Sequence, residues 1–185
     1  MDNGAEFYRR YRHGDDSGLA GLIRLHMDGL TLYLNGIVGD IYAAEDLTED
    51  TFVKLATKKP RFSGKSSFKT WLYAIGRNLA LDYLKKESRY ADCGTESGLQ
   101  RLRAEEDLEA AYIREDQRTE VRQMLRRLKP EYRQVLWLIY FENFSIREAA
   151  AVMRKSTHAT ETLVYRARQA LKSKLNEEGF VYEEL

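Results

Sequence analysis

The sequence predicts an all-α protein with two helical domains joined by a flexible linker. Apolar residues recur at helical spacing over several long segments of the 185-residue chain. Only two prolines, Pro60 and Pro130, interrupt the chain, so long helices are permitted over most of its length. No glycine occurs between Gly98 and Gly179, which indicates a C-terminal domain that is almost continuously helical.

The N-terminal domain is expected to cover residues 1–90. Its predicted helices are one at about 17–34, a second at about 43–57 and a third that ends near residue 87. Pro60 stops the second helix, and Ser66 or Ser67 is the expected N-cap of the third.

The C-terminal domain is expected at residues 118–185, after an acidic linker at 91–117. Its helices are predicted near residues 118–128, 131–142, 146–153 and 158–175. Pro130 suits the first position of a helix. Ser145 and Glu148 have the spacing of a capping box, which places a helix start between them.

The formal net charge of +1 conceals two basic blocks. Basic residues predominate over 65–89 and again over 120–175, and an acidic stretch at 91–118 separates the two blocks. Such a distribution indicates either two polyanion-binding modules on one chain or solvated faces of helices. Charge alone leaves both interpretations open.

The residues of the chain form no pattern of metal, cofactor or catalytic chemistry. The single cysteine, Cys93, excludes an intramolecular disulfide and a cysteine-based zinc site. His13, His26 and His158 are too scattered for a metal site, and no nucleophile–base set or cofactor-binding glycine motif is present. We therefore expect neither an enzyme nor a cofactor. No apolar run has the length of a membrane span, and the N-terminus does not resemble a signal peptide, so a cytoplasmic protein without membrane insertion is expected.

The last two predicted helices have the pattern of a helix-turn-helix. A short helix at 146–153 precedes an amphipathic helix at 158–175, whose outward face is polar and basic. Ala149 and Ala150 are small enough for the two helices to approach closely. This pattern favours DNA binding, although any helical hairpin shows it in part.

Three segments of the chain resemble the sigma factors of bacterial RNA polymerase, in their extracytoplasmic-function (ECF) group. The runs YRQVLWLIYFENFS at 132–145 and YRARQAL at 165–171 resemble sigma region 4. The run AEDLTEDTF at 44–52 resembles region 2.2, and FKTWLYAIGRNLALDYL at 68–84 resembles regions 2.3 and 2.4. The resemblance implies a factor that directs core polymerase to specific promoters by recognising and melting the −10 element and recognising the −35 element.

The resemblance also implies partners. In this family, region 2.2 docks on the clamp helices of the polymerase β′ subunit, and the β flap is a further expected contact. Asp46, Glu49 and Asp50 are the candidate docking residues, and their spacing places them on one face of a helix. Family members are often held inactive by an anti-sigma protein, so such a partner is expected here without assigned residues.

Region 2 residues of the family hold the opened −10 strand, which requires cations for phosphates and a surface for unstacked bases. The resemblance gives as −10 candidates Lys65, Ser66, Ser67, Lys69, Arg77, Asn78, Lys85 and Lys86. Asn78 carries both a donor and an acceptor for a base edge. Trp71 and Tyr73 are possible stacking platforms, although the apolar stripe of the helix favours a core position for Trp71.

The helix at 158–175 is expected to read the −35 element in the major groove. The −35 candidates are Arg147, Lys155, His158, Glu161, Thr162, Tyr165, Arg166 and Arg168. The sequence departs from the family here, because Glu161 and Leu163 stand where basic residues are common, and Arg154 and His158 replace small turn residues. Altered −35 specificity is therefore expected.

Two other functions remain open at this point. A sigma-like adapter would bind polymerase without recognising a promoter, which the departures at Glu161 and Leu163 would explain. A stand-alone helix-turn-helix regulator would never bind polymerase, and it leaves the acidic segment at 45–50 unexplained.

Overall fold

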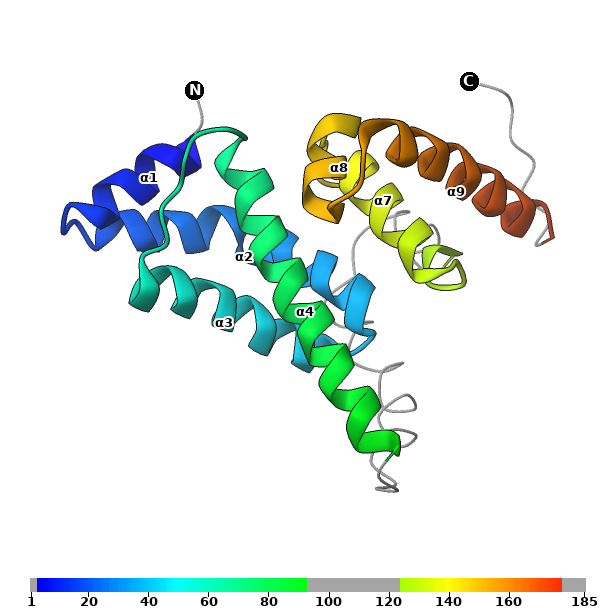
Figure 1. The fold of residues 1–185 in the computed structure, drawn as a ribbon, viewed down its shortest axis with the longest axis horizontal. Coiled ribbons are helices and arrows are strands. Elements are labelled where there is room, and N and C mark those ends of the chain that lie inside the picture. The colour runs from blue at the N-terminus through cyan, green and yellow to red at the C-terminus, as the bar shows by residue number, and fades with distance from the viewer. Residues whose placement is uncertain (1–2, 93–123, 178–185) are drawn as a thin grey trace.

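The computed structural model describes residues 3–92 and 124–177, and every regular element in these two ranges is a helix. The named helices are α1 (Asn3–Arg12), α2 (Ser17–Val38), α3 (Ile41–Lys58), α4 (Phe68–Asp92), α7 (Pro130–Tyr140), α8 (Ile146–Met153) and α9 (Thr157–Glu177). Figure 1 shows the first four as one group and the last three as a second group beside it. The all-α prediction is confirmed. Cys93, most of the expected linker and most of the helix expected at 118–128 lie outside the described residues.

Helix α2 forms the centre of the N-terminal group and packs against α1, α3 and α4. Leu22, Leu30 and Leu34 of α2 are fully buried in this core. Gly18 permits the close crossing of α1, because a Cβ atom there would lie 2.3 Å from the backbone oxygen of Phe7. The core therefore fixes the relative positions of α3 and α4, which carry the candidate residues of this domain.

Helix α1 has no counterpart among the helices that the sequence predicts. It buries Gly4, Tyr8 and Tyr11 rather than a stripe of aliphatic residues. The Tyr8 hydroxyl donates to the Pro60 carbonyl at 2.6 Å, and the Tyr11 hydroxyl donates to the Ala56 carbonyl at 3.1 Å. These contacts attach α1 to the end of α3, and a search for aliphatic periodicity does not detect them.

Local capping chemistry sets the bounds of the N-terminal helices. Asp40 begins α3, since its carboxylate accepts hydrogen bonds from the backbone N–H groups of Tyr42 and Ala43. The preceding helix ends at Gly39, whose φ of 78° is left-handed. Ser67 is the N-cap of α4, as expected, because its Oγ accepts from the Thr70 N–H at 3.2 Å.

The C-terminal helices begin where the sequence predicts. Pro130 occupies the start of α7. At α8, Ser145 Oγ accepts from the Glu148 N–H at 3.3 Å, and the Glu148 carboxylate accepts from the Ser145 N–H at 3.0 Å. This confirms the capping box. Arg154, with a φ of 55°, makes the left-handed turn that separates α8 from α9 in a helix-turn-helix.

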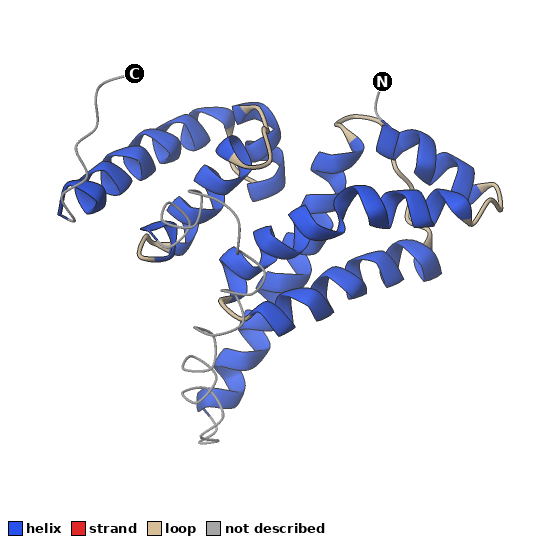
Figure 2. Cartoon of the chain, turned by 180° about the vertical axis from the view of Figure 1, so that it is seen from behind, coloured by secondary structure: helices blue, strands red, loops and turns tan. Residues whose placement is uncertain are grey.

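The two groups of helices pack against each other. Helix α8 lies against α4, and α7 lies against α2, as the views from both sides show (Figures 1 and 2). The buried apolar residues of both groups form one continuous cluster. The sequence predicts two domains but does not predict this contact between them.

Candidate nucleic-acid interface

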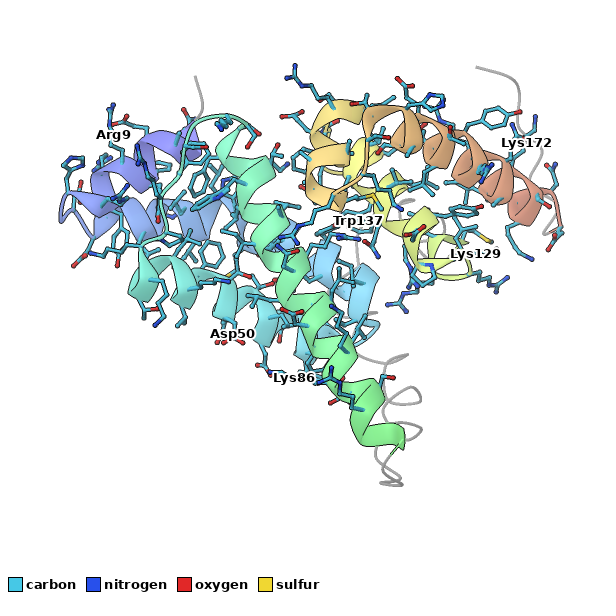
Figure 3. All side chains as sticks on the ribbon, in the orientation of Figure 1. Arg9, Asp50, Lys86, Lys129, Trp137 and Lys172 are labelled. Carbon is cyan, nitrogen blue, oxygen red and sulfur yellow. The ribbon has the colours of Figure 1, made fainter. Side chains whose placement is uncertain are left out.

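Helix α3 presents an acidic face to solvent. Asp46, Glu49 and Asp50 are all exposed, and Asp46 lies one turn from both of the others. The opposite face is buried, and there the Thr31 hydroxyl donates to Thr48 Oγ1 at 3.1 Å across the contact with α2. None of the three carboxylates forms an ion pair within the residues that the structure describes. Figure 3 shows Asp50 on the outer side of α3.

Two exposed apolar side chains flank these carboxylates. Tyr42 is 56% exposed and Val53 is 54% exposed, one turn before and one turn after the acidic residues. Exposed apolar residues beside a charged stripe are a common feature of protein interfaces. Helical periodicity predicts an inward position for Val53, so its exposure corrects that expectation, and Tyr42 precedes the helix predicted at about 43–57.

The loop that precedes α4 is attached to an aromatic cluster. Phe62 packs 5.5 Å from Phe68 and 5.3 Å from Trp71, as measured between ring centroids. Trp71 is half-buried and packs against the core, as the apolar stripe indicates. Lys65 is exposed at the tip of the loop and Ser66 is half-buried. The cluster thus positions the loop at the start of α4.

The −10 candidates on α4 have two different environments. Lys85 and Lys86 are exposed near the far end of the helix, where Figure 3 shows Lys86 away from the C-terminal helices. Asn78 is half-buried. Arg77 is buried, and its Nε donates to Gln134 Oε1 of α7 at 3.0 Å. Arg77 thus contacts the C-terminal domain, as do Ser67 through Glu148 and Lys69 through Glu142.

Tyr73 does not form a stacking platform in this structure. Its side chain is only 1% exposed, and its hydroxyl donates to Glu142 Oε2 at 2.7 Å. The pKa of Tyr73 is raised well above its usual value. Burial is the larger cause, and the negative charge of Glu142 is the second. The expectation of stacking at Tyr73 is corrected, because the C-terminal domain covers the ring.

The outward face of α9 carries most of the −35 candidates. His158, Glu161, Tyr165 and Arg166 are exposed, and Thr162 is half-buried. Tyr165, at 65%, is a prominent exposed aromatic side chain. These residues form one strip along the helix, and the exposed Arg147 stands on α8. The arrangement can place polar and aromatic side chains against base edges and basic ones against phosphates.

The remaining −35 candidates are Lys155, which lies just before α9, and Arg168, which lies on α9. Lys155 and Arg166 line a hollow of about 570 Å³ beside the start of α7, where Lys155 Nζ lies 3.1 Å from Glu131 Oε1. Arg168 lies on the other edge, and its guanidinium carbon is 5.5 Å from the ring centroid of Tyr140. Arg168 is therefore turned toward α7.

The described ranges contain neither a metal-binding cluster nor a helix that could span a membrane. No group of three or more His, Cys, Asp or Glu residues within 3–92 and 124–177 is placed to hold a metal ion. None of the helices in that part of the chain combines the length and apolar character needed to cross a membrane.

Family models match both parts of the chain. Sigma-70 region 2 matches residues 22–90, and sigma-70 region 4 matches residues 118–171. The chain belongs to the sigma-70 family of RNA polymerase sigma factors. The region 2 match includes the acidic segment that a stand-alone helix-turn-helix regulator leaves unexplained. As a sigma factor, the protein directs core RNA polymerase to promoters.

Curated relatives place the chain in the ECF group of this family. The chain is 26% identical to the ECF sigma factor SigW of Bacillus subtilis over 178 residues, which covers 91% of this chain and 95% of the relative. It is 31% identical to the ECF sigma factor SigC of Mycobacterium tuberculosis over 141 residues, which covers 72% of this chain and 71% of the relative.

Solved structures show the same fold. CnrH, in complex with the cytosolic domain of CnrY, has a TM-score of 0.69 at 23% identity, over 96% of this chain and 100% of that chain. RpoE of Bartonella quintana, in complex with the anti-sigma factor NepR, has a TM-score of 0.64 at 23% identity, over 83% of this chain and 94% of that chain.

Proposed function

We propose that this sigma factor divides its work among three helices: α3 docks on core polymerase, α4 holds the opened −10 strand and α9 reads the −35 element. Residues 1–90 and 118–185 act as the two functional domains, with 91–117 as the linker. The factor carries no catalysis of its own, since nucleotide addition belongs to the polymerase, and it works in the cytoplasm. The observation that carries this proposal is the separation of an acidic face on α3, whose carboxylates form no ion pair within the described residues, from basic and polar faces on α4 and α9.

The acidic face of α3 suits a basic surface on the polymerase. Asp46, Glu49 and Asp50 offer carboxylates that no cation of the described chain neutralises, so a partner's bases gain their full attraction. Tyr42 and Val53 supply apolar area at both ends of this stripe. The β′ clamp helices are the proposed partner, with the β flap as a second polymerase contact for the C-terminal domain.

The −10 strand is proposed to follow α4 from its N-terminal loop. Lys65 and Ser66 stand on a loop that the Phe62 contacts hold in place, which suits capture of an extruded base. Asn78 offers a donor and an acceptor to a base edge. Lys85 and Lys86 offer exposed cations to phosphates further along the strand.

The −35 element is proposed to contact the exposed strip of α9. Thr162, Tyr165 and Arg166 face the major groove, and Arg147 and Lys155 hold phosphates on either side. His158 Nδ1 lies 3.9 Å from Glu161 Oε2, which places the imidazole beside this carboxylate at the start of α9. Glu161 then accepts a hydrogen bond from a cytosine amino group.

An anti-sigma protein is the proposed regulator. RpoE of Bartonella quintana was solved with an anti-sigma factor, and CnrH was solved with the cytosolic domain of CnrY. A partner of that kind would act here by covering the faces of α3, α4 or α9.

Run-off transcription tests the proposal. The template is fragmented genomic DNA, transcribed by core polymerase in the presence and absence of the protein. We expect discrete new start sites only when the protein is present, with shared sequences upstream that define both promoter elements. Binding to core polymerase without new starts would contradict the promoter assignments on α4 and α9. Failure to bind core polymerase would contradict the docking role of α3.

A further inference from the structure

The hollow between the start of α7 and α9 gathers basic side chains from three separate parts of the C-terminal domain. Lys129 precedes α7, Lys155 stands in the turn before α9, and Arg166 lies on α9 itself. The hollow has a volume of about 570 Å³, within the range of about 300–1,000 Å³ that is typical of small-molecule sites. It is therefore large enough for an organic ligand rather than a single ion.

These cations are only partly neutralised within the protein. Glu131 also lines the hollow, and its Oε1 lies 3.1 Å from Lys155 Nζ. Lys129 and Arg166 are both exposed, and neither forms an ion pair within residues 3–92 and 124–177. Their positive charge is thus available to an anionic ligand, and a concave surface with an excess of one charge attracts such ligands effectively.

The backbone at the start of α7 adds to this positive potential. The helix has 11 residues, and its N-cap residue, Lys129, makes no side-chain capping hydrogen bond. The N–H groups at a helix start and the helix dipole both favour a phosphate there. The first turn of α7 lines the same hollow as the three basic side chains, so the two attractions act on one ligand.

Tyr132 and Leu163 give the hollow an apolar side. Tyr132 is half-buried and packs against the core, so its ring is held in place. Leu163 is buried on the inner face of α9. Every nucleobase has a π face that can stack on an aromatic side chain. The hollow thus combines cations that suit phosphates with an aromatic ring that suits a base.

We propose that this hollow binds a nucleotide. Lys129, Lys155 and Arg166 hold its phosphates, and its base packs on the ring of Tyr132. Three cations suit a nucleoside that carries more than one phosphate. This ligand goes beyond the function proposed above, which gives no role to Lys129 or Tyr132.

The nucleotide and the −35 element share two of these cations. Lys155 and Arg166 are also proposed to contact the −35 duplex, so the two ligands exclude each other at these side chains. Promoter DNA makes many contacts besides these, so it displaces the nucleotide when both are present. The nucleotide is therefore a ligand of the factor before promoter binding. This competition rests on the −35 role proposed for α9, whereas nucleotide binding itself does not.

Isothermal titration calorimetry of the full chain tests the site, with ADP and inorganic pyrophosphate as probes. Both probes carry two linked phosphates, but only ADP has a base. We expect ADP to bind about tenfold more tightly than pyrophosphate, because its base stacks on Tyr132. Tyr132→Leu should remove this difference and leave pyrophosphate binding unchanged, which also shows that the variant is folded.

Lys129→Glu tests the position of the phosphates. It replaces an exposed cation of the hollow by a carboxylate, so we expect both probes to bind about tenfold more weakly. Lys172→Glu is the matched control, because Lys172 is exposed on α9, outside the hollow, and undergoes the same change of charge. Figure 3 shows Lys172 away from Lys129. Lys172→Glu should bind both probes nearly as the wild type does.

A labelled promoter duplex distinguishes a free nucleotide from the phosphates of DNA. The duplex carries the promoter that run-off transcription defines, and its binding to the full chain is measured by fluorescence anisotropy. We expect saturating ADP to weaken duplex binding by the wild type and to have a smaller effect on Lys129→Glu. Duplex binding that ADP does not change would contradict the sharing of Lys155 and Arg166.

Each other outcome overturns a defined part of the inference. No detectable binding of ADP at millimolar concentration would remove the nucleotide site. Equal weakening in Lys129→Glu and Lys172→Glu would assign binding to net charge. Equal affinity for ADP and pyrophosphate would remove the base from the site.

The DNA backbone is the other source of phosphates for this hollow. Weaker duplex binding in Lys129→Glu, without ADP binding in the wild type, would assign the hollow to the DNA backbone alone and overturn the nucleotide. Run-off transcription by the wild type tests the sigma activity separately, so failure of the nucleotide site is distinguishable from failure of the proposed function.

Discussion

Lys69 and Glu142 lie 73 positions apart in the chain, and their side chains meet at 2.9 Å between Nζ and Oε2. Glu142 Oε2 also accepts a hydrogen bond from the Tyr73 hydroxyl. A cation, a carboxylate and a phenol therefore form one polar cluster between the two domains. Such a group is favourable only while all its members remain paired.

Alkaline pH should destabilise the folded chain through Tyr33 and Tyr73. Burial raises the pKa of both phenols above the usual 10.0, while in the unfolded chain they ionise near that value. Their contribution is therefore complete below about pH 10 and is lost as pH rises further, by at most about 1.4 kcal/mol per pH unit for each tyrosine. Urea unfolding at about pH 8 and about pH 11 measures the loss.

Phenylalanine variants separate the tyrosines from other alkaline effects. Tyr73→Phe should be less stable near neutral pH, because Glu142 loses a donor, yet its stability should fall less steeply above pH 10. The exposed Tyr42 provides the control, since Tyr42→Phe should retain the wild-type slope. Identical slopes in all three proteins would contradict the assignment.

The capping box at α8 should contribute measurably to the free energy of unfolding. Ser145→Ala removes the oxygen that accepts the Glu148 N–H, which should cost about 1 kcal/mol of unfolding free energy. Ser173→Ala, on the exposed side of α9, should cost almost nothing. Urea unfolding compares the two, and equal effects would show that the cap contributes no specific stability.

Local chemistry explains why these caps were predictable from the sequence. Ser67, Pro130 and the Ser145–Glu148 pair each act within four residues, so their spacing contains all the information needed. The contact of Lys69 with Glu142 depends on how two domains pack, and neither residue carries a local signal of its partner. This contact also covers Tyr73, which the sequence alone offers as a stacking surface.

The sequence does not predict helix α1, and the reason is a different one. Tyr8 and Tyr11 attach it by hydroxyl hydrogen bonds to carbonyl groups near the end of α3, and Gly18 lets its backbone approach α2. Aliphatic periodicity, which revealed the other helices of this domain, does not detect such packing. The exposed α3 carboxylates were recognisable because acidic residues at helical spacing form a face whatever packs behind them.

Charge reversal on α3 should weaken docking on core polymerase. Asp46→Lys replaces the carboxylate that lies one turn from both Glu49 and Asp50, and we expect about a tenfold loss of affinity, largest at low salt. Glu6→Lys, which makes the same change of charge on the exposed side of α1, should bind core polymerase as the wild type does. Biolayer interferometry at several salt concentrations measures both, and an equal loss in the two variants would indicate a general charge effect.

Asn78 should matter for strand opening more than for duplex binding. Asn78→Ala removes the donor and acceptor offered to a base, so fewer thymines near the start site should react with permanganate. Binding of duplex promoter through α9 should persist. Asp82→Ala, one turn further along α4 and exposed, is the control. Wild-type thymine reactivity in Asn78→Ala would remove this residue from the −10 site.

Glu161 allows base reading to be distinguished from charge repulsion at the −35 element. If its carboxylate accepts from a cytosine amino group, Glu161→Gln should move the preference at one base pair toward adenine, with a discrimination of about 1–3 kcal/mol. If Glu161 only repels phosphates, removing its charge should strengthen binding to every sequence alike. Duplexes with single base-pair changes in the −35 element, compared by fluorescence anisotropy, separate the two.

Glu161→Lys completes this comparison. A new cation near the backbone should steepen the dependence of log affinity on log salt by about one unit without favouring any base. A wild-type base profile in Glu161→Gln, together with a steeper salt dependence in Glu161→Lys, would show that Glu161 limits affinity and reads no base. A changed base profile in Glu161→Gln would show that Glu161, where this chain departs from the family pattern, helps to determine promoter choice.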